Sequence, residues 1–188
     1  MSDASRLDPA AWLVMLGRDG IEYLVGGSVA AMAFGVDLVP GDLDVVPSLD
    51  SDNLRRLGLL LQRVGAKPKH VPEWREGPDR EACERWRPEP FDVAALDHRF
   101  VTPWGELDVV PVKAGRYDEL RPTAVTFTAF GNVIQVVHPD QLIAQLERWD
   151  RPRDRARHAA LVEARARFLS GETPPVLDVH RGWAAPTP

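Results

Sequence analysis

A short apolar run from Ile21 to Val25 ends in Gly26-Gly27-Ser28, and a stretch of small apolar residues follows directly. Glycine tolerates the backbone conformations of a tight turn, so this pattern predicts a strand that passes straight into a helix. Such a unit needs a sheet in which the strand can pair and on which the helix can pack. The turn amides and the Ser28 hydroxyl can approach a phosphate, although many helices begin this way to satisfy their own amide groups.

The next predicted strand, Leu43 to Pro47, has one aspartate just before it and one within it. Side chains alternate along a strand, so Asp42 and Asp44 point to the same side. Neighbouring carboxylates repel each other, and a divalent cation such as magnesium offsets that repulsion. For the Asp-Leu-Asp triplet alone, two solvent-exposed acids at a strand end are the simpler interpretation. The glycine turn nearby favours a combined metal and phosphate site.

A third acid lies in the sequence Gly-Glu-Leu-Asp-Val-Val at residues 105–110. Asp108 interrupts an apolar strand, where a charge is costly unless it has a partner. If this strand lies beside the one that carries Asp42 and Asp44, three carboxylates converge and can hold two metal ions about 3.5–4 Å apart. Glu106 shares the face of Asp108 and is a weaker candidate for the same site.

Periodicity and turn residues predict the remaining elements. Two hairpins are expected, at residues 98–112 with a turn at 102–105, and at residues 123–138 with a turn at 131–132. Helices are expected from Asp8-Pro9 onward and over residues 51–64, 139–149 and about 152–169. We therefore divide the chain into a core (1–138), C-terminal helices packed on that core (139–170) and a loose tail (171–188).

Residues 66–96 contain five prolines together with Trp74 and Trp86. Because proline interrupts regular structure, we expect a long irregular connection with one short helix near Pro78 to Trp86. Long loops are often functional, so a lid over a substrate is one interpretation. A packed loop whose tryptophans fill a small satellite core is an equally good one.

Composition excludes several classes of protein. The net charge of -5 and the pI of about 5.5 argue against a broad nucleic-acid-binding surface. The single cysteine, Cys83, cannot form an internal disulfide, which fits a reducing compartment. The N-terminus lacks the basic start and apolar run of a signal peptide, and no apolar stretch is long enough to span a bilayer. We therefore expect a cytoplasmic protein without a membrane partner.

Three segments, YLVGGSVAAMAFG…GDLDVV, WGELDVVPV and HPDQLIAQLERWDRPRD, resemble the polymerase-beta-like nucleotidyltransferase superfamily. Within it they are most similar to small bacterial members related to AbiEii-type toxins of toxin-antitoxin systems. The resemblance covers roughly residues 20–165. It implies an α+β fold, with a mixed, largely antiparallel sheet flanked by helices and a short C-terminal helical extension.

The same resemblance implies metal-dependent transfer of a nucleoside monophosphate from a nucleoside triphosphate, such as ATP, to an acceptor hydroxyl, with release of pyrophosphate. By this likeness Gly26–Ser28 bind the triphosphate. Asp42 and Asp44 bind two ions of Mg²⁺ or Mn²⁺. Asp108 binds the catalytic ion and helps to deprotonate the acceptor.

Two departures from the family pattern stand out. Relatives often carry an arginine and a threonine where this chain has Leu-Val-Pro-Gly at residues 38–41, and many carry a lysine where it has Leu146. Such a lysine neutralises phosphate charge. Three nearby arginines can substitute for it and are assigned to nucleotide binding: Arg148, Arg151 and Arg153. The alternative for residues 151–154, which end in Asp154, is a solvated helix start.

Three functions are therefore weighed. The first is an active nucleotidyltransferase whose acceptor is a small molecule such as an antibiotic, a transfer RNA end or a protein hydroxyl. The second is a catalytically lapsed domain that binds a nucleotide or a partner protein; the missing lysine favours it, and the three carboxylates argue against it. The third, a metal-dependent phosphodiesterase, is disfavoured because the histidines are scattered.

Overall fold

One seven-stranded sheet runs through the computed structural model, which describes residues 6–69, 80–89, 91–112 and 115–172. The strands are β1 (Tyr23–Val25), β2 (Asp42–Pro47), β3 (Lys67–Pro68), β4 (Arg99–Thr102), β5 (Gly105–Val109), β6 (Val125–Ala129) and β7 (Asn132–Val136). Their order is β3-β4-β5-β2-β1-β7-β6. The β2–β5 and β1–β7 pairs are parallel and the other four pairs are antiparallel, which confirms the expected mixed, largely antiparallel sheet.

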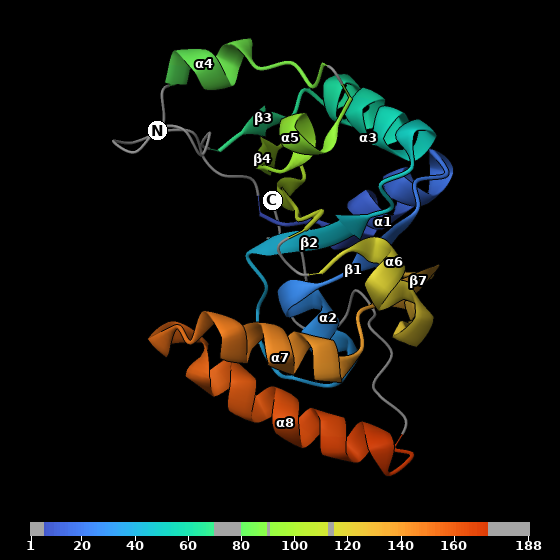
Figure 1. Cartoon of the computed structure of the whole chain (residues 1–188), viewed down its shortest axis with the longest axis vertical. Helices are drawn as coiled ribbons and strands as arrows, with labels where there is room; N and C mark the ends of the chain where they lie inside the picture. The colour runs from blue at the N-terminus through green and yellow to red at the C-terminus, as the bar shows by residue number, and fades with distance from the viewer. Residues whose placement is uncertain (1–5, 70–79, 90, 113–114, 173–188) are drawn as a thin grey trace, which may run out of the picture.

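Helices flank this sheet, as expected for the α+β class (Figure 1). The α-helices are α1 (Pro9–Arg18), α2 (Gly27–Ala33), α3 (Ser51–Arg63), α4 (Arg80–Arg85), α5 (Val93–Leu96), α6 (Tyr117–Leu120), α7 (Pro139–Trp149) and α8 (Arg155–Leu169). Two 3₁₀ turns, η1 (Arg121–Thr123) and η2 (Pro152–Asp154), precede β6 and α8. The predicted helices and hairpins are present with small shifts at their ends. The elements β3, α5 and α6 were not predicted, because two to four residues show no recognisable periodicity.

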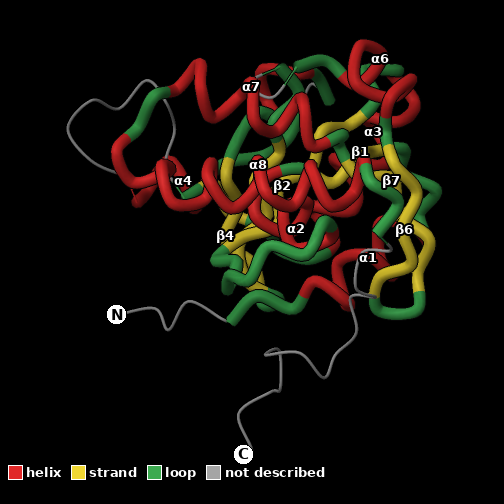
Figure 2. The backbone as a smooth tube through the Cα atoms, turned by 90° about the horizontal axis from the view of Figure 1, so that it is seen from below, coloured by secondary structure: helices red, strands yellow, loops and turns green. Residues whose placement is uncertain are grey.

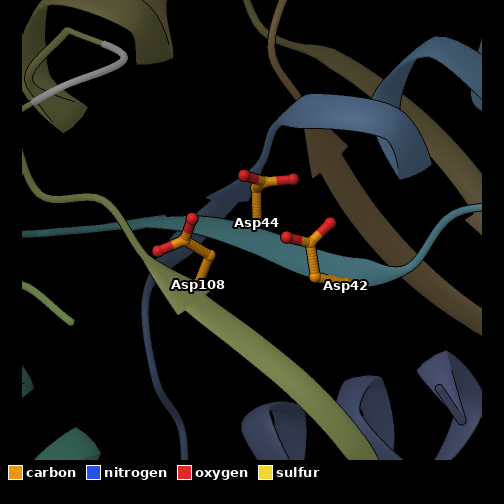
Figure 3. A group of neighbouring side chains, drawn as sticks. All are labelled: Asp42, Asp44 and Asp108. Carbon is orange, nitrogen blue, oxygen red and sulfur yellow. The ribbon is translucent and has the colours of Figure 1, made fainter. Parts of the chain in front are cut away.

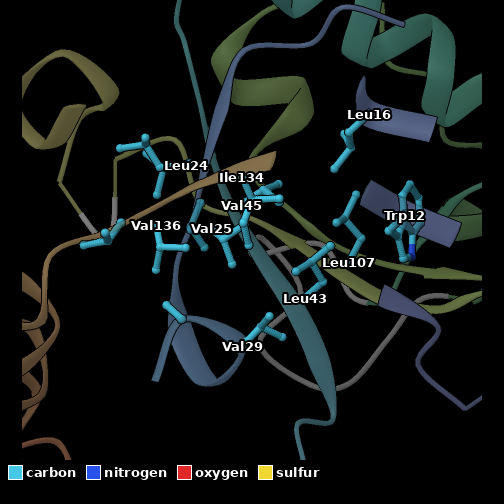
Figure 4. Packing of buried hydrophobic residues seen from close by; sticks show 14 of the residues in the cluster. Trp12, Leu16, Leu24, Val25, Val29, Leu43, Val45, Leu107, Ile134 and Val136 are labelled. Carbon is cyan, nitrogen blue, oxygen red and sulfur yellow. The ribbon is translucent and has the colours of Figure 1, made fainter. Parts of the chain in front are cut away.

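Alternation along β2 and β5 separates an apolar face of the sheet from an acidic one. Leu43 and Val45 are buried and lie beside Leu107 and Val109 in the parallel pair. These side chains join the core together with residues of β1, β7 and α1, as Figure 4 shows. Because successive side chains point to opposite faces, the aspartates between them face the other way.

The two C-terminal helices cover the acidic side of the sheet. Helix α7 contacts α2 and lies antiparallel beside α8, and both views show the two helices together (Figure 2). Phe168, near the end of α8, packs edge-on against Phe34, the residue that ends α2, with ring centroids 5.2 Å apart. Residues 139–169 are therefore packed against the rest of the protein.

The proline-rich connection between residues 66 and 96 is partly described. It contains β3, α4 and α5, and α4 corresponds to the short helix expected near Pro78 to Trp86. Trp86 packs against the buried Phe100 of β4 at 4.9 Å between ring centroids, so it joins the main hydrophobic core and not a satellite core. Trp74 lies outside the described residues, as does the predicted tail from position 173 onward. No helix in the described ranges is long and apolar enough to cross a membrane.

Candidate metal and phosphate site

Strand pairing brings together three carboxylates that lie far apart in the sequence. Asp44 of β2 is the direct neighbour of Asp108 of β5, and Asp42 is the neighbour of Glu106. Oxygen atoms of Asp42, Asp44 and Asp108 all lie within 4.8 Å of one another (Figure 3). The three side chains are partly buried and share the face opposite the apolar one. The three carboxylates therefore converge, as predicted for the case in which these two strands are neighbours.

The glycine turn before α2 fits closely around Asp44. Gly27 has a φ of +57°, and a Cβ atom there would lie 1.8 Å from Oδ2 of Asp44. The Gly26 amide donates a hydrogen bond to the Asp44 carbonyl oxygen at 2.9 Å. A side chain at position 27 would be strained by its backbone conformation and would displace the carboxylate. The position of the Asp44 carboxylate is therefore sufficient to explain why position 27 is a glycine, whether or not a phosphate binds there.

The donor set suits a hard divalent cation. All three side chains offer carboxylate oxygens, the ligand type that Mg²⁺ and Mn²⁺ prefer. Magnesium is usually held by one or two carboxylates together with substrate phosphates, and the acids here line a cavity. The residues present therefore fit a metal ion of this kind.

A cation that the sequence analysis did not single out already contacts this cluster. Arg99 of β4 places Nη2 2.8 Å from Oδ2 of Asp42 and 2.9 Å from Oδ2 of Asp108. Arg99 and Asp108 are direct partners in the antiparallel β4–β5 pair. The guanidinium also lies 3.8 Å from Glu106, which Lys69 contacts at 2.6 Å.

Burial and crowding of charge shift the acidity of the site. Burial raises the pKa of Asp44 to about 7, and the negative charges of Asp42 and Asp108 make a smaller contribution in the same direction. Removal from water also raises the pKa of Asp42, although the positive charge of Arg99 opposes that change. Partial burial by itself would lower the pKa of Arg99, but its hydrogen bond to Asp108 and the surrounding carboxylates raise it instead. The cluster therefore holds more negative charge than its surroundings favour.

A cavity of about 580 Å³ separates the acids from the C-terminal helices, a volume in the usual range for small-molecule sites. Besides the acids, its lining comprises the turn and strand residues Gly26, Gly27, Asp97, His98, Arg99 and Val110. From α7 come Leu142, Gln145, Leu146 and Trp149, and from η2, α8 and the residue before them come Arg151, Arg153, Asp154, Arg157 and Leu161. The wall opposite the carboxylates is rich in arginine.

One buried carboxylate holds two of these arginines. Asp154 is 7% exposed and accepts hydrogen bonds from Nε of Arg151 at 2.5 Å and from Nη2 of Arg157 at 2.7 Å. The guanidinium of Arg151 also lies over the ring of Trp149, 4.2 Å from its centroid. Pro152 and Arg153 are exposed, as expected for a solvated helix start, but Asp154 is buried and paired, so that interpretation does not hold for Asp154. Fixed guanidinium groups of this kind are suited to phosphate oxygens.

Some of the residues assigned to nucleotide binding line the cavity and others do not. Arg151 and Arg153 line it, as do Gly26 and Gly27. Ser28 is buried at 8% exposure and Arg148 is exposed, and neither of these two described residues is part of the lining. Sequence reasoning missed Arg157, Gln145 and Arg99.

Leu146, at the position of the missing lysine, is 6% exposed. It packs in the hydrophobic core while also facing the cavity.

Fold and cavity together define an α+β protein with a candidate site for a divalent cation and an anionic ligand. Comparison with solved structures finds similarity to an antigenic nucleotidyltransferase-like protein from Paracoccidioides brasiliensis. The TM-score is 0.46 and the identity 14%, over 86% of this chain and 73% of that one. No protein-family model and no curated protein matches the chain.

Proposed function

We propose that this protein is a metal-dependent nucleotidyltransferase. One observation carries the proposal: a cluster of three carboxylates faces, across one cavity, arginines that the buried Asp154 holds in place. Carboxylates suit a hard cation and guanidinium groups suit phosphate oxygens, so a nucleoside triphosphate with its metal would satisfy both walls. The sequence resemblance to polymerase-beta-like nucleotidyltransferases supports the same substrate. The relationship to AbiEii-type toxins stays a prediction.

In this proposal Asp42, Asp44 and Asp108 hold Mg²⁺ or Mn²⁺. Bound ions of this charge neutralise the phosphates and the leaving group. Gly26 and Gly27 line the cavity beside Asp44, so a triphosphate bound there would lie near the backbone of this turn. In this proposal Asp42 and Asp44 contribute to binding as well as to transfer, whereas Asp108 contributes mainly to transfer.

The arginines of the opposite wall bind the triphosphate. Arg151 and Arg157 are pre-oriented by Asp154, and Arg153 lines the same part of the cavity. They take the role that a lysine has in relatives, where this chain has the buried Leu146. A guanidinium can contact two phosphate oxygens at once, so two fixed arginines offer more contacts than one lysine.

The proposed reaction is an in-line displacement at the α-phosphorus. The acceptor hydroxyl oxygen forms a bond to phosphorus while the bond from phosphorus to the α–β bridging oxygen breaks. Pyrophosphate leaves with that electron pair. Asp108 accepts the proton of the attacking hydroxyl, and the arginines stabilise the charge that develops on the phosphates.

A catalytically lapsed domain that binds a nucleotide or a partner protein is the second candidate. Two observations favour it: Leu146 is buried at the lysine position, and Arg99 already neutralises part of the acidic cluster. Under this alternative the protein binds a nucleotide but transfers nothing.

The acceptor is proposed by class: a small molecule, a transfer RNA end or a protein hydroxyl. The net charge of -5 disfavours RNA, because phosphate contacts dominate RNA affinity.

The test incubates the full chain with nucleoside triphosphates labelled at the α- or γ-phosphate, with Mg²⁺ or Mn²⁺ and a cell extract. Transfer of the α-label without the γ-label supports the proposal.

The matched control for this assay is the double variant Asp42→Asn and Asp44→Asn, which should transfer no label. Nucleotide binding without label transfer to any component would favour the lapsed domain. The absence of nucleotide binding with either metal would contradict both candidates.

A further inference from the structure

Arg99 has no part in the transfer reaction proposed above, yet it contacts two of the three carboxylates of the acidic cluster. A single nitrogen, Nη2, lies 2.8 Å from Asp42 and 2.9 Å from Asp108 and so bridges two of the three carboxylates. The Nε atom adds a 3.3 Å hydrogen bond to Asp108. The guanidinium therefore lies where a cation shared by these two carboxylates would have to lie.

We propose that Arg99 is the resident cation of the carboxylate cluster, and that its guanidinium leaves Asp42 and Asp108 when the cluster takes up a divalent cation. This inference rests on the proposed function, because it takes these carboxylates to be metal ligands. Three acids within 4.8 Å of one another need a positive partner. A guanidinium and a divalent ion would repel each other strongly at such short range, so one excludes the other.

The structure offers Arg99 places to move. Its side chain is 35% exposed, so the rotation is not blocked by a packed core. The Glu106 carboxylate lies 3.8 Å from Nη1 and can keep one partner for the guanidinium after it leaves Asp42. Arg99 also lines the cavity, where a bound phosphate would offer it a second partner.

This exchange would couple the binding of metal and nucleotide. A metal ion that binds alone must displace Arg99 and supplies no new anionic partner to the displaced guanidinium. A metal ion that arrives with a triphosphate supplies phosphate oxygens to the displaced guanidinium. Because coupling of two ligands is reciprocal, nucleotide would strengthen metal binding as much as metal strengthens nucleotide binding.

The experiment is a Mn²⁺ titration of the full chain without nucleotide, followed by electron paramagnetic resonance of free Mn²⁺. Arg99→Gln removes the competing charge and should bind Mn²⁺ at least about tenfold more tightly than the parent. Lys69→Gln is the matched control, because it removes a positive charge beside Glu106 without touching Asp42 or Asp108. It should change the affinity by less than about twofold, as for a partly exposed pair.

A second measurement does not depend on the folding of any variant. The Arg99 side-chain N–H resonance of the parent chain, followed by ¹⁵N nuclear magnetic resonance, should shift on addition of Mg²⁺ because its hydrogen bond to Asp108 is lost.

The outcomes separate the inference from the proposed function. Equal Mn²⁺ affinity of parent and Arg99→Gln, or an Arg99 signal unmoved at saturating Mg²⁺, would overturn the exchange while leaving the metal site intact. The absence of Mn²⁺ binding in parent and variant, with or without nucleotide, would overturn both.

Discussion

Asp44 is the most constrained residue of the site. Its carboxylate lies against Gly27, where even one additional carbon atom would collide with it. Loss of water contact and two neighbouring acids raise its pKa to about 7. A site that tolerates such a carboxylate without a metal does so at the expense of stability, and that cost is measurable.

The pKa of Asp44 predicts an unusual dependence of stability on pH. The native state holds this proton more tightly than the unfolded chain, whose pKa is near 3.8. Stability from this group is therefore fully present below about pH 4 and is lost as the pH rises through about 7. The asparagine of Asp44→Asn cannot ionise. Without divalent ions the melting temperature of this variant should therefore exceed that of the parent by an amount that grows between about pH 5 and pH 8. Each kcal/mol of difference in the free energy of unfolding corresponds to roughly 2–4 °C for a chain of this size.

Calorimetry at both pH values, with a chelator present, checks this prediction. Asp37→Asn is the control, because Asp37 is exposed and lies outside the cluster. A melting-temperature difference between parent and Asp44→Asn that stays constant with pH would show that Asp44 titrates normally.

Asp108 and Asp42 should differ in what they do. Asp108→Asn keeps the size of the side chain, so the fold and most magnesium-nucleotide affinity should survive while transfer falls at least ~100-fold. Asp42→Asn should weaken binding as well as transfer. Nucleotide titrations beside a turnover assay measure both effects. The assignment of roles would be reversed if Asp108→Asn abolished nucleotide binding and Asp42→Asn left it intact.

The junction between α7 and α8 shows how local chemistry shapes a binding wall. Asp150 ends α7 in the left-handed conformation, with a φ of +42°. The chain then turns through η2, and Asp154 is buried between the two arginines on either side of it. The side chain of Asp154 caps no helix amide, so its role is to hold the arginines.

Asp154→Asn should release Arg151 and Arg157 and leave them without their charged partner. Breaking a buried ion pair from one side is destabilising, and with partly exposed arginines we expect about 1–3 kcal/mol. Nucleotide affinity, measured by titration well below the melting temperature, should fall about tenfold as the guanidinium groups lose their orientation.

Asp150→Asn is the matched control for that experiment, since it lies at the same junction and asparagine tolerates the left-handed conformation. Its stability and nucleotide affinity should match those of the parent. If Asp154→Asn lost stability but bound nucleotide normally, Asp154 would be a structural residue alone.

The cavity lies between two parts of the protein, the acidic face of the sheet and the C-terminal helices. A ligand that contacts both walls would join α7 and α8 more firmly to the sheet. Ligand binding to the native state must also raise the free energy of unfolding.

We therefore predict that Mg²⁺ and a nucleoside triphosphate together raise the melting temperature. At about 100 times the dissociation constant the stabilisation should be about 2.7 kcal/mol. Either ligand alone should give a smaller shift. Scanning calorimetry of the parent and of the double variant Asp42→Asn and Asp44→Asn measures the effect, and an equal shift in both proteins would place the ligand outside the acidic cluster.

Much of the site could be predicted from local patterns. Period-two alternation put Asp42 and Asp44 on one face, and the glycine turn indicated a strand that enters a helix directly. The predicted turn at residues 102–105 also places Arg99 opposite Asp108 in the hairpin, so the signal for that pair was present. Within residues 66–96 the short helix α4 was expected, but β3 and α5 could not be predicted, because two to four residues show no recognisable periodicity.

The sequence by itself therefore determined which residues share a face, since strand and helix periods are local properties of the backbone. Tertiary structure decided which faces meet. The parallel pairing of β2 with β5 joins segments about sixty residues apart, and it alone sets Asp108 beside Asp44. Packing of α7 and α8 over the sheet likewise brought Arg157 and the buried Asp154 to the cavity, because contacts between distant elements depend on the whole core.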